Sequence, residues 1–223
     1  MIKKYFITGT DTNVGKTIIS CALIKYFVKK GYKTIGYKPI ASGSYVTNLG
    51  SRNDDVIKLL FSSNVNLKYN QINIYSLINS TSPHIASMDE KIKINIKKIS
   101  KNLKKLESLG DYIFIEGAGG WFTPLSNNYF FSDWVIYEKI SVILVVGLKL
   151  GCLNHALLTI ESIKNSNINI TGWIANHLYP ITHRSKEYII SLNKMLKIPL
   201  LGEFPWIKKL EKTDTSKYIK FDF

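Results

Sequence analysis

The segment from Tyr5 to Val28 joins an apolar strand, a glycine-bearing loop and a helix, and it constrains the fold more than any other part of the chain. Its loop, between Gly9 and Thr17, reads Gly-Thr-Asp-Thr-Asn-Val-Gly-Lys-Thr. In such a loop the backbone N–H groups converge on phosphate oxygens, the lysine ammonium reaches the terminal phosphates and the threonine hydroxyl can bind Mg²⁺. The helix that follows adds its positive N-terminal dipole. The segment therefore predicts a phosphate-binding strand, loop and helix.

The glycine spacing of this loop departs from the usual phosphate-loop pattern. That pattern has four residues between its first glycine and Gly-Lys, whereas five separate Gly9 from Gly15, and Thr10 stands where a glycine is expected. One interpretation is an ordinary turn that contains Gly-Lys-Thr by chance. The context favours a phosphate loop, because an apolar strand precedes it and residues 17–28 have the apolar spacing of a helix.

Strand-like apolar runs recur between helical patterns along the whole chain. They are Tyr5 to Thr8, Thr34 to Tyr37, Tyr112 to Ile115, Ser141 to Val146, Ile170 to Ala175 and Pro199 to Leu201. This alternation predicts a three-layer α/β fold, with a mostly parallel central sheet flanked by helices. No linker or repeat divides residues 1–223, so we expect a single domain.

Polar or glycine-rich residues follow each predicted strand, at the edge of the sheet where ligands bind in such folds. Lys38 and Ser42 follow the second strand, and Glu116 opens a Glu-Gly-Ala-Gly-Gly stretch after the third. The later strands lead into Gly151-Cys-Leu-Asn154, into Asn176-His177 and into Pro205-Trp206. This is the distribution that a nucleotide-dependent enzyme requires.

Five of these side chains suit phosphoryl transfer, which needs charge compensation, oxygen ligands for Mg²⁺ and a positioned ammonium. They are Lys16, Thr17, Lys38, Asp55 and Glu116. Asp55 has the alternative of a surface or helix-capping acid, because Asp54 stands beside it. Lys38 has the alternative of an ordinary surface lysine. The four histidines show no metal-ligand spacing, and the four tryptophans are interpreted as packing residues, with Trp206 also suited to wall an adenine pocket.

Composition bears on the compartment and on the partners. The chain has no signal-peptide pattern or membrane-length apolar run, and Cys21 and Cys152, in a helix and a loop pattern, give neither a disulfide framework nor a zinc site, so we expect a cytoplasmic protein. The net charge of +14 comes almost entirely from lysine spread through the chain. Its densest cluster, over residues 91–105, reads as an amphipathic helix with a solvated face. We therefore expect no nucleic acid and no membrane partner.

Five stretches occur together in an order that is characteristic of one enzyme family. They are Gly-Thr-Asp-Thr-Asn-Val-Gly-Lys-Thr, Gly-Tyr-Lys-Pro-Ile-Ala-Ser-Gly, Thr-Ser-Pro-His, Glu-Gly-Ala-Gly-Gly-Trp-Phe-Thr-Pro-Leu and Gly-Cys-Leu-Asn-His-Ala. From Tyr5 to about Trp206 the chain closely resembles the ATP-dependent dethiobiotin synthetases, P-loop enzymes of biotin biosynthesis. The wider spacing between Gly9 and Gly15 is the form that this family uses.

The resemblance implies that ATP drives the union of CO₂ with 7,8-diaminononanoate, a nine-carbon diamino acid. One amine takes up CO₂ as a carbamate, the carbamate oxygen attacks the γ-phosphate, and the second amine displaces phosphate as a cyclic urea closes. Lys16 and Lys38 would stabilise the carbamate and the transferring phosphoryl group, with Lys38 and Lys16 as the catalytic pair. Thr17, Asp55 and Glu116 would hold Mg²⁺.

The resemblance also assigns the binding residues. Those of the ATP site are Asn13, Val14, Gly15, Lys16, Thr17, Ile18, Asp55, Glu116, Gly117, Ala118, Gly119, Asn176, His177, Pro205, Trp206 and Ile207. Thr12 and Ser42 would lie near the diamine. The distant carboxylate of the substrate would bind across a homodimer interface, at Gly151, Cys152, Asn154 and Tyr188.

Two positions depart from the family pattern, and two other functions compete with this one. Asn13 stands where many relatives have a glutamate, and His177 replaces an acidic or amide residue; both changes bear on nucleotide binding rather than on the reaction type. A phosphate-loop switch or partitioning ATPase would explain the loop and the charge, but not Lys38 with Ser42 at one edge. A related amide-forming synthetase normally needs an additional glutamine-hydrolysing domain, for which the chain has no room.

Overall fold

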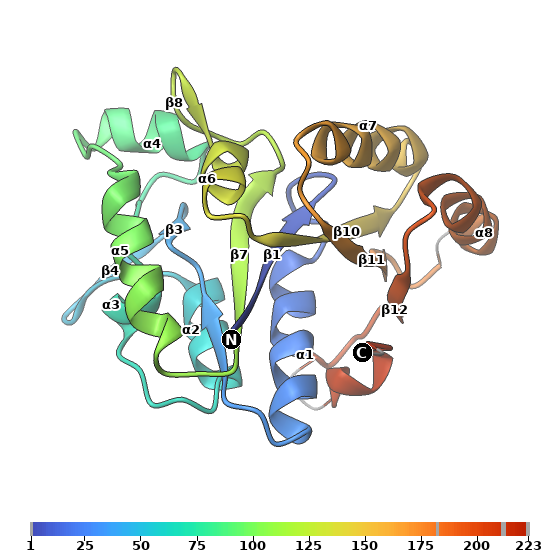
Figure 1. Ribbon diagram of the computed structural model, residues 1–223, viewed down its shortest axis with the longest axis horizontal. Coiled ribbons are helices and arrows are strands. Elements are labelled where there is room, and N and C mark those ends of the chain that lie inside the picture. The colour runs from blue at the N-terminus through green and yellow to red at the C-terminus, as the bar shows by residue number, and fades with distance from the viewer. Residues whose placement is uncertain (1, 182, 211–212, 222–223) are drawn as a thin grey trace.

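A sheet of six parallel strands forms the centre of the computed structural model, which describes residues 2–181, 183–210 and 213–221 (Figure 1). The strand order is β12-β11-β10-β1-β7-β2, and every neighbouring pair is parallel. The bounds are β1 Lys3–Gly9, β2 Thr34–Tyr37, β7 Tyr112–Gly120, β10 Ser141–Leu148, β11 Ile170–His177 and β12 Leu200–Phe204. The predicted α/β fold with a mostly parallel sheet is confirmed, and each predicted strand overlaps one of these six.

Both faces of the sheet are buried, which explains why its strands read as continuous apolar runs. Successive side chains of β10 alternate between two parts of the core. Leu144 and Val146 pack in the cluster beneath α7 (Cys152–Asn165) and α8 (Ser185–Leu196). Ile143 and Val145 belong to the larger cluster, which also contains Tyr5, Phe6 and Ile7 of β1.

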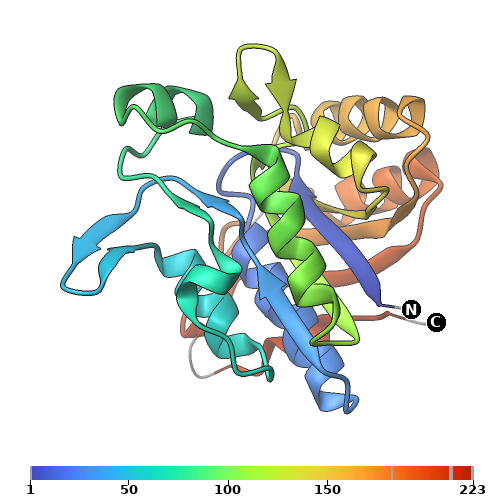
Figure 2. The same ribbon diagram turned by 60° about the vertical axis from the view of Figure 1, so that its left-hand side comes forward.

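Helices cover the two faces of this sheet. Figure 2 shows α5 (Ile96–Glu107) in front of the strands and α1 (Lys16–Lys29) behind them, as right-handed crossovers require. Other helices among the residues that the structure describes are α2 Asp54–Ser62, α3 Tyr69–Ile72, α4 Pro83–Asp89, α6 Phe131–Tyr137 and the 3₁₀ turn η2 Thr215–Tyr218. Three short pairs lie outside the central sheet: β3 Ile40–Ala41 with β6 Tyr75–Ser76, β4 Tyr45–Thr47 with β5 Gly50–Arg52, and β8 Pro124–Ser126 with β9 Tyr129–Phe130. Among the described residues, no helix combines the length and apolar content of a membrane span.

Two local predictions are wrong. The helix expected over residues 91–105 begins only at Ile96, because Asn95 caps it by accepting a hydrogen bond from the Lys98 N–H and Lys91 adopts a left-handed φ of 54°. Cys152 lies in a helix rather than a loop: it is the first residue of α7, and it is buried. The tryptophan prediction is confirmed for Trp121, Trp134 and Trp173, which are buried, whereas Trp206 is exposed.

The end of the chain returns to its beginning. Residue Phe221 packs edge-on against Tyr5 and Phe27, and its main-chain oxygen accepts a hydrogen bond from Tyr26 Oη. Lys29 and Asp214 form an ion pair on the same side. The segment after β12 is therefore fastened to the helix that follows the phosphate loop.

Candidate active site

A cavity of about 920 Å³ opens at the carboxyl edge of the central sheet, where the fold predicts a ligand. The loop between β1 and α1 forms one wall, and the ends of β2 and β7 form another. Its lining residues are Thr10, Asp11, Thr12, Asn13, Gly15, Lys16, Thr17, Ile18, Lys38, Ser42, Asp55, Lys58, Ser80, Thr81, Ser82, Pro83, Glu116, Gly117, Ala118, Gly119, Gly120, Phe122, Thr123 and Pro124. Such a volume accommodates a nucleotide together with a small second substrate.

The shape of the phosphate loop depends on a residue far along the chain. Gly15 has a φ of 95°, and a Cβ atom at this position would lie 2.2 Å from Asn176 Nδ2. The same Asn176 Nδ2 donates a hydrogen bond of 2.9 Å to the main-chain oxygen of Val14. Asn13 is also left-handed, with a φ of 59°, which asparagine tolerates better than most residues. The end of β11 therefore supports the turn that leads into α1.

Substitution of Gly15 with alanine should weaken ATP binding by at least about tenfold. A left-handed alanine costs about 1–2 kcal/mol, and its Cβ also collides with the Asn176 amide. Gly31→Ala is the matched control, since Gly31 has a φ of 86° but no atom within 4 Å of the added Cβ. Both variants should lower the melting temperature, whereas titration calorimetry with ATP should show the affinity loss for Gly15→Ala alone. Equal affinities in the two variants would contradict the role given to this contact.

Lys16 reaches into the loop that precedes it. Its Nζ donates a hydrogen bond of 2.9 Å to the main-chain oxygen of Asp11, and the side chain is buried. Burial lowers the pKa of Lys16 to about 8, and the negative charge of Glu116 only partly opposes this effect. A buried ammonium with a neutral acceptor gains much from an anion brought beside it. The residue is therefore well placed to bind a phosphate oxygen.

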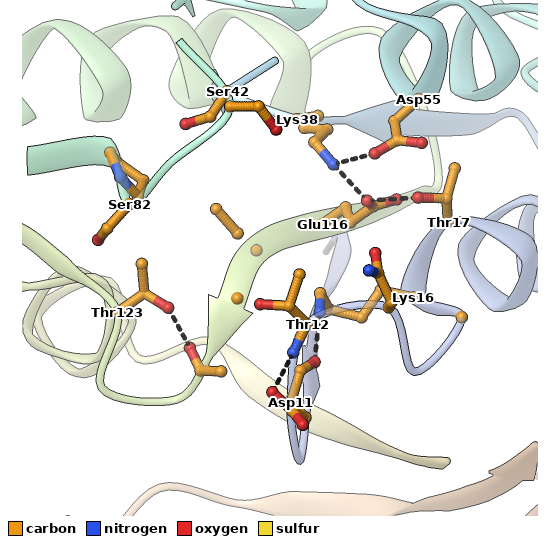
Figure 3. A pocket seen from close by; sticks show the side chains of 18 of the residues that line it. Asp11, Thr12, Lys16, Thr17, Lys38, Ser42, Asp55, Ser82, Glu116 and Thr123 are labelled. Atoms are coloured by element: carbon orange, nitrogen blue, oxygen red, sulfur yellow. Dashed lines mark hydrogen bonds and ion pairs between the residues drawn. The ribbon is translucent and has the colours of Figure 1, made fainter. Parts of the chain in front are cut away.

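Four side chains form a hydrogen-bonded cluster where this loop meets the ends of β2 and β7 and the start of α2. Lys38 Nζ lies 2.6 Å from Glu116 Oε1 and 2.7 Å from Asp55 Oδ2, and Thr17 Oγ1 donates to Glu116 Oε1 at 2.8 Å (Figure 3). Burial acts to lower the pKa of Lys38, but the two carboxylates outweigh burial, so this pKa lies above its ordinary value. Burial acts to raise the pKa of Asp55, yet the Lys38 ammonium holds it below its usual value. Lys38 and Asp55 are therefore both charged near neutral pH.

Local structure explains how Lys38 and Asp55 meet. Lys38 follows β2 directly and its N–H donates to the main-chain oxygen of Ile72. Asp55 lies in the first turn of α2, where the capping side chain of Asn53 accepts a hydrogen bond from its N–H. The surface-lysine alternative for Lys38 is wrong, since only 6% of this residue is exposed. Asp55 likewise contacts Lys38 rather than serving only as a surface acid.

Two polar atoms in this site have no hydrogen-bond partner among the residues that the structure describes. They are Glu116 Oε2 and Ser42 Oγ, and both are buried. A buried oxygen without a partner is costly unless a ligand, ion or water satisfies it. These two atoms therefore indicate where a polar ligand or cation would bind.

The structure brings most of the predicted site residues together, and it separates the others. Thr12, Asn13, Ile18, Ser42 and Gly117 to Gly119 line the cavity, as do the phosphate-loop residues Gly15 to Thr17. Val14 is buried beneath the loop, and Asn176 supports the loop from below. The residues that do not line this cavity are Gly151, Cys152, Asn154, His177, Tyr188, Pro205, Trp206 and Ile207. His177 instead forms a 2.8 Å contact with Glu203.

Several lining residues were not predicted as site residues. Ser80 to Pro83 lead into α4, and Phe122 to Pro124 join β7 to β8; both segments border the cavity. The motifs Thr-Ser-Pro-His and Trp-Phe-Thr-Pro contain most of these residues, so the sequence carried a signal for them. Asp11 and Lys58 also face the cavity, but a single acid or lysine in a polar segment gives no such signal.

Comparisons with known proteins agree with this geometry. A family model described as an AAA domain matches residues 3–214. The ATP-dependent dethiobiotin synthetase of Baumannia cicadellinicola is 49% identical over 219 residues, which cover 98% of this chain and 97% of that protein. This chain belongs to the ATP-dependent dethiobiotin synthetase family. The Escherichia coli K12 dethiobiotin synthetase is 48% identical over 220 residues, with 98% of each chain covered. The protein is accordingly an ATP-dependent ligase, and ATP is its co-substrate.

Two solved structures resemble this chain at sequence identities so low that they bear on the fold alone. The septum site-determining protein MinD of Pyrococcus horikoshii has a TM-score of 0.61 at 16% identity, covering 99% of this chain and 87% of that one. A ParA family ATPase from Chlorobium tepidum has a TM-score of 0.60 at 13% identity, covering 98% and 97%. These likenesses confirm a P-loop fold, but identities this low carry no argument for a partitioning function.

Proposed function

We propose that this dethiobiotin synthetase joins CO₂ to 7,8-diaminononanoate at the expense of ATP and closes a cyclic urea, giving dethiobiotin, ADP and phosphate. The cluster of Lys38, Glu116, Asp55 and Thr17 beside Lys16 carries this proposal. It combines a phosphate-binding lysine and a second buried lysine in one cavity. A switch ATPase needs the first lysine, whereas an anionic carbamate intermediate accounts for the second.

The reaction has three bond-forming steps. One amine attacks CO₂ and loses a proton, which forms the carbamate C–N bond. A carbamate oxygen then attacks the γ-phosphorus as the bond to ADP breaks, and the second amine finally attacks the carbamoyl carbon as phosphate leaves. The first two steps place anionic oxygens between the amines and the triphosphate. Fixed cations that face these oxygens are the main means of stabilising them.

Lys38 has the donor that such an oxygen needs. An ammonium group has three N–H donors, and those of Lys38 contact Asp55 and Glu116, leaving one without a partner among the described residues. The third donor is free to hold a carbamate oxygen. Thr12 and Ser42 line the same cavity, and the buried hydroxyl of Ser42 suits an amine or a carbamate.

The residues present also fit a magnesium ion. Mg²⁺ prefers oxygen ligands, and Thr17 Oγ1, Asp55 and the unpartnered Glu116 Oε2 supply them. When bound, Mg²⁺ would neutralise charge on the transferring phosphoryl group. Thr17, Asp55 and Glu116 are therefore proposed as its protein ligands, with Lys38 holding the two carboxylates in place.

Substitution of Glu116 with glutamine should raise the Mg²⁺ concentration that gives half-maximal turnover by about tenfold, as loss of a supporting or ligating carboxylate commonly does. The variant keeps the shape of the side chain but removes its charge. A magnesium titration at saturating ATP measures the effect. Asp54→Asn serves as the control, because Asp54 lies beside the proposed ligand Asp55 in the first turn of α2. Among the described residues, the Asp54 carboxylate accepts a hydrogen bond from Tyr45 alone, and this bond is exposed. An unchanged magnesium requirement in Glu116→Gln would contradict the metal assignment.

We also propose a homodimer with the carboxylate of the substrate at its interface. Gly151 precedes α7 with a φ of 90°, and Cys152 and Asn154 form the first turn of this helix. Large apolar side chains on α7, on α8 and on the segments before them are exposed, including Leu150, Leu158, Tyr179, Ile181 and Ile190. An exposed apolar surface of this kind is typical of an interface. Light scattering on the protein as it elutes from a size-exclusion column tests for this dimer. A monomer at micromolar concentration would contradict the proposal.

The base of ATP is proposed to lie near Asn176 and the segment Pro205 to Ile207. Asn176 already touches the phosphate loop, and this segment follows the neighbouring strand β12. Trp206 is exposed, which leaves it accessible for stacking on a base.

The decisive experiment measures phosphate release from MgATP and bicarbonate, with and without 7,8-diaminononanoate, followed by mass analysis of the product. We expect release that requires the diamine, together with the mass of the cyclic urea. ATP hydrolysis that ignores the diamine would favour a switch ATPase instead. Absence of hydrolysis would contradict the proposed activity.

A further inference from the structure

An ion pair outside the cluster around Lys38 joins the phosphate loop to the segment that leads into α7. Lys149 Nζ lies 2.7 Å from Asp11 Oδ2, with 34% and 43% of the two side chains exposed. Lys149 follows β10 directly, and its main-chain oxygen accepts a hydrogen bond of 3.0 Å from the Cys152 N–H. The same residue therefore holds the first turn of α7 through its backbone and the phosphate loop through its side chain.

Asp11 is the centre of the hydrogen bonds in that loop. Its main-chain oxygen accepts from Lys16 Nζ, its Oδ1 accepts from the Thr12 N–H at 2.7 Å, and its Oδ2 accepts from Lys149. Figure 3 shows Asp11 beside Thr12 and Lys16 at the edge of the cavity. The main chain that carries the acceptor of the Lys16 ammonium and the side chain that pairs with Lys149 thus belong to one residue, so a displacement of the Asp11 backbone would affect both contacts.

The Asp11 carboxylate disfavours the binding of a polyphosphate in this cavity. Asp11 lines the cavity, and a negative charge repels an anionic ligand in this surrounding of lowered dielectric constant. The Lys149 ammonium offsets that charge. The hydrogen bond from Lys149 also lowers the pKa of Asp11, so the pair is ionised throughout the neutral range. Ion pairs of this exposure contribute little to stability, so the expected effect of this pair is on ligand binding.

We propose that Lys149 is a positioning residue that acts through Asp11. It neutralises the Asp11 charge, which would otherwise repel ATP, and it fixes the position of the phosphate loop relative to residues 151–154. The second part rests on the proposed function, because residues 151–154 matter to catalysis only if they bind the carboxylate of the diamino acid. In the proposed dimer, this pair connects the ATP site of one protomer to the substrate carboxylate at the interface.

The test uses Lys149→Met, Asp11→Asn and the double variant, with kcat and both KM values measured for each. In Lys149→Met we expect the KM for ATP and the KM for the diamine each to rise about fivefold, within the range of such couplings. Adding Asp11→Asn should restore the KM for ATP, because the uncompensated charge is gone. The KM for the diamine should stay raised in the double variant, to the same value as in Lys149→Met.

Lys4→Met is the matched control. Lys4 forms a 2.6 Å ion pair with Glu107 at the amino end of β1, away from the cavity. All variants should melt within a few degrees of the wild type. The proposal is overturned if Lys149→Met matches Lys4→Met in both KM values, or if Asp11→Asn does not restore the KM for ATP. A wild type without diamine-dependent turnover would refute the proposed function instead, and ATP affinities of the same variants from calorimetry would still decide whether Lys149 acts through Asp11.

Discussion

Substitution of Lys16 with alanine is expected to lower diamine-dependent phosphate release by on the order of a hundred- to a thousandfold, the loss that follows removal of one transition-state contact. The ammonium of Lys16 is buried at the phosphate loop, and its one hydrogen bond among the described residues is to the neutral main-chain oxygen of Asp11. No neighbouring lysine replaces it there, because Lys38 is engaged by two carboxylates. Turnover at saturating ATP and ATP affinity should both decrease.

Stability should behave differently from activity in this variant. Burial holds the pKa of Lys16 at about 8, below the ordinary lysine value, so the folded protein disfavours the charged form. At pH 7, below both pKa values, the charge therefore costs stability, and removing it should not lower the melting temperature. Lys16→Met retains the apolar stem and separates loss of charge from loss of packing. Lys25→Ala, at an exposed position on the same helix, is the control. Substantial turnover in Lys16→Ala would contradict the phosphate-loop assignment.

Substitution of Lys38 with alanine or methionine should lower the rate of chemistry far more than it weakens ATP binding. Lys38 contacts Glu116 and Asp55, and its remaining donor is proposed to hold the carbamate rather than the triphosphate. We expect a decrease in kcat of at least about a hundredfold, with ATP affinity changed only a few fold. Single-turnover kinetics and ATP titration measure the two effects. Equal losses in both would indicate a merely structural lysine.

The Lys38 variants should also unfold more easily, so a double variant is needed to separate the loss of stability from the loss of activity. Without Lys38 the buried Glu116 carboxylate loses the ammonium with which it forms an ion pair, and removal of one partner from a buried pair is strongly destabilising. Combining Lys38→Met with Glu116→Gln removes both charges and should recover most of the melting temperature. Turnover should not recover. A double variant that regains activity would show that Lys38 serves only to neutralise Glu116.

The succession of the six strands along the chain could be predicted from the sequence, because each strand of a parallel sheet with helices on both faces is a separate apolar run. The run at residues 141–146 illustrates this, since both faces of β10 are buried. The residue at which a helix begins was harder to predict. The repeating isoleucines of residues 92–99 suggested a longer helix, but the side chain of Asn95 stops it at Ile96.

Contacts between distant segments account for what the sequence could not indicate in the site. Lys38 precedes a proline in a polar stretch, and only the placement of α2 and β7 makes it a buried lysine between two acids. The support that Asn176 gives to the phosphate loop joins positions 162 residues apart. Lys149 resembles many other lysines in a chain of this composition until the fold brings it to Asp11.

The return of the C-terminal segment to α1 has a consequence for the order in which this protein is made. The rings of Tyr5 and Phe27 are translated early, whereas Phe221, which completes their packing, follows the last strand of the sheet, β12. A nascent chain therefore cannot finish the aromatic cluster beside its first strand until it has been translated past β12. Translation of the six strands alone would leave the base of α1 without this cover.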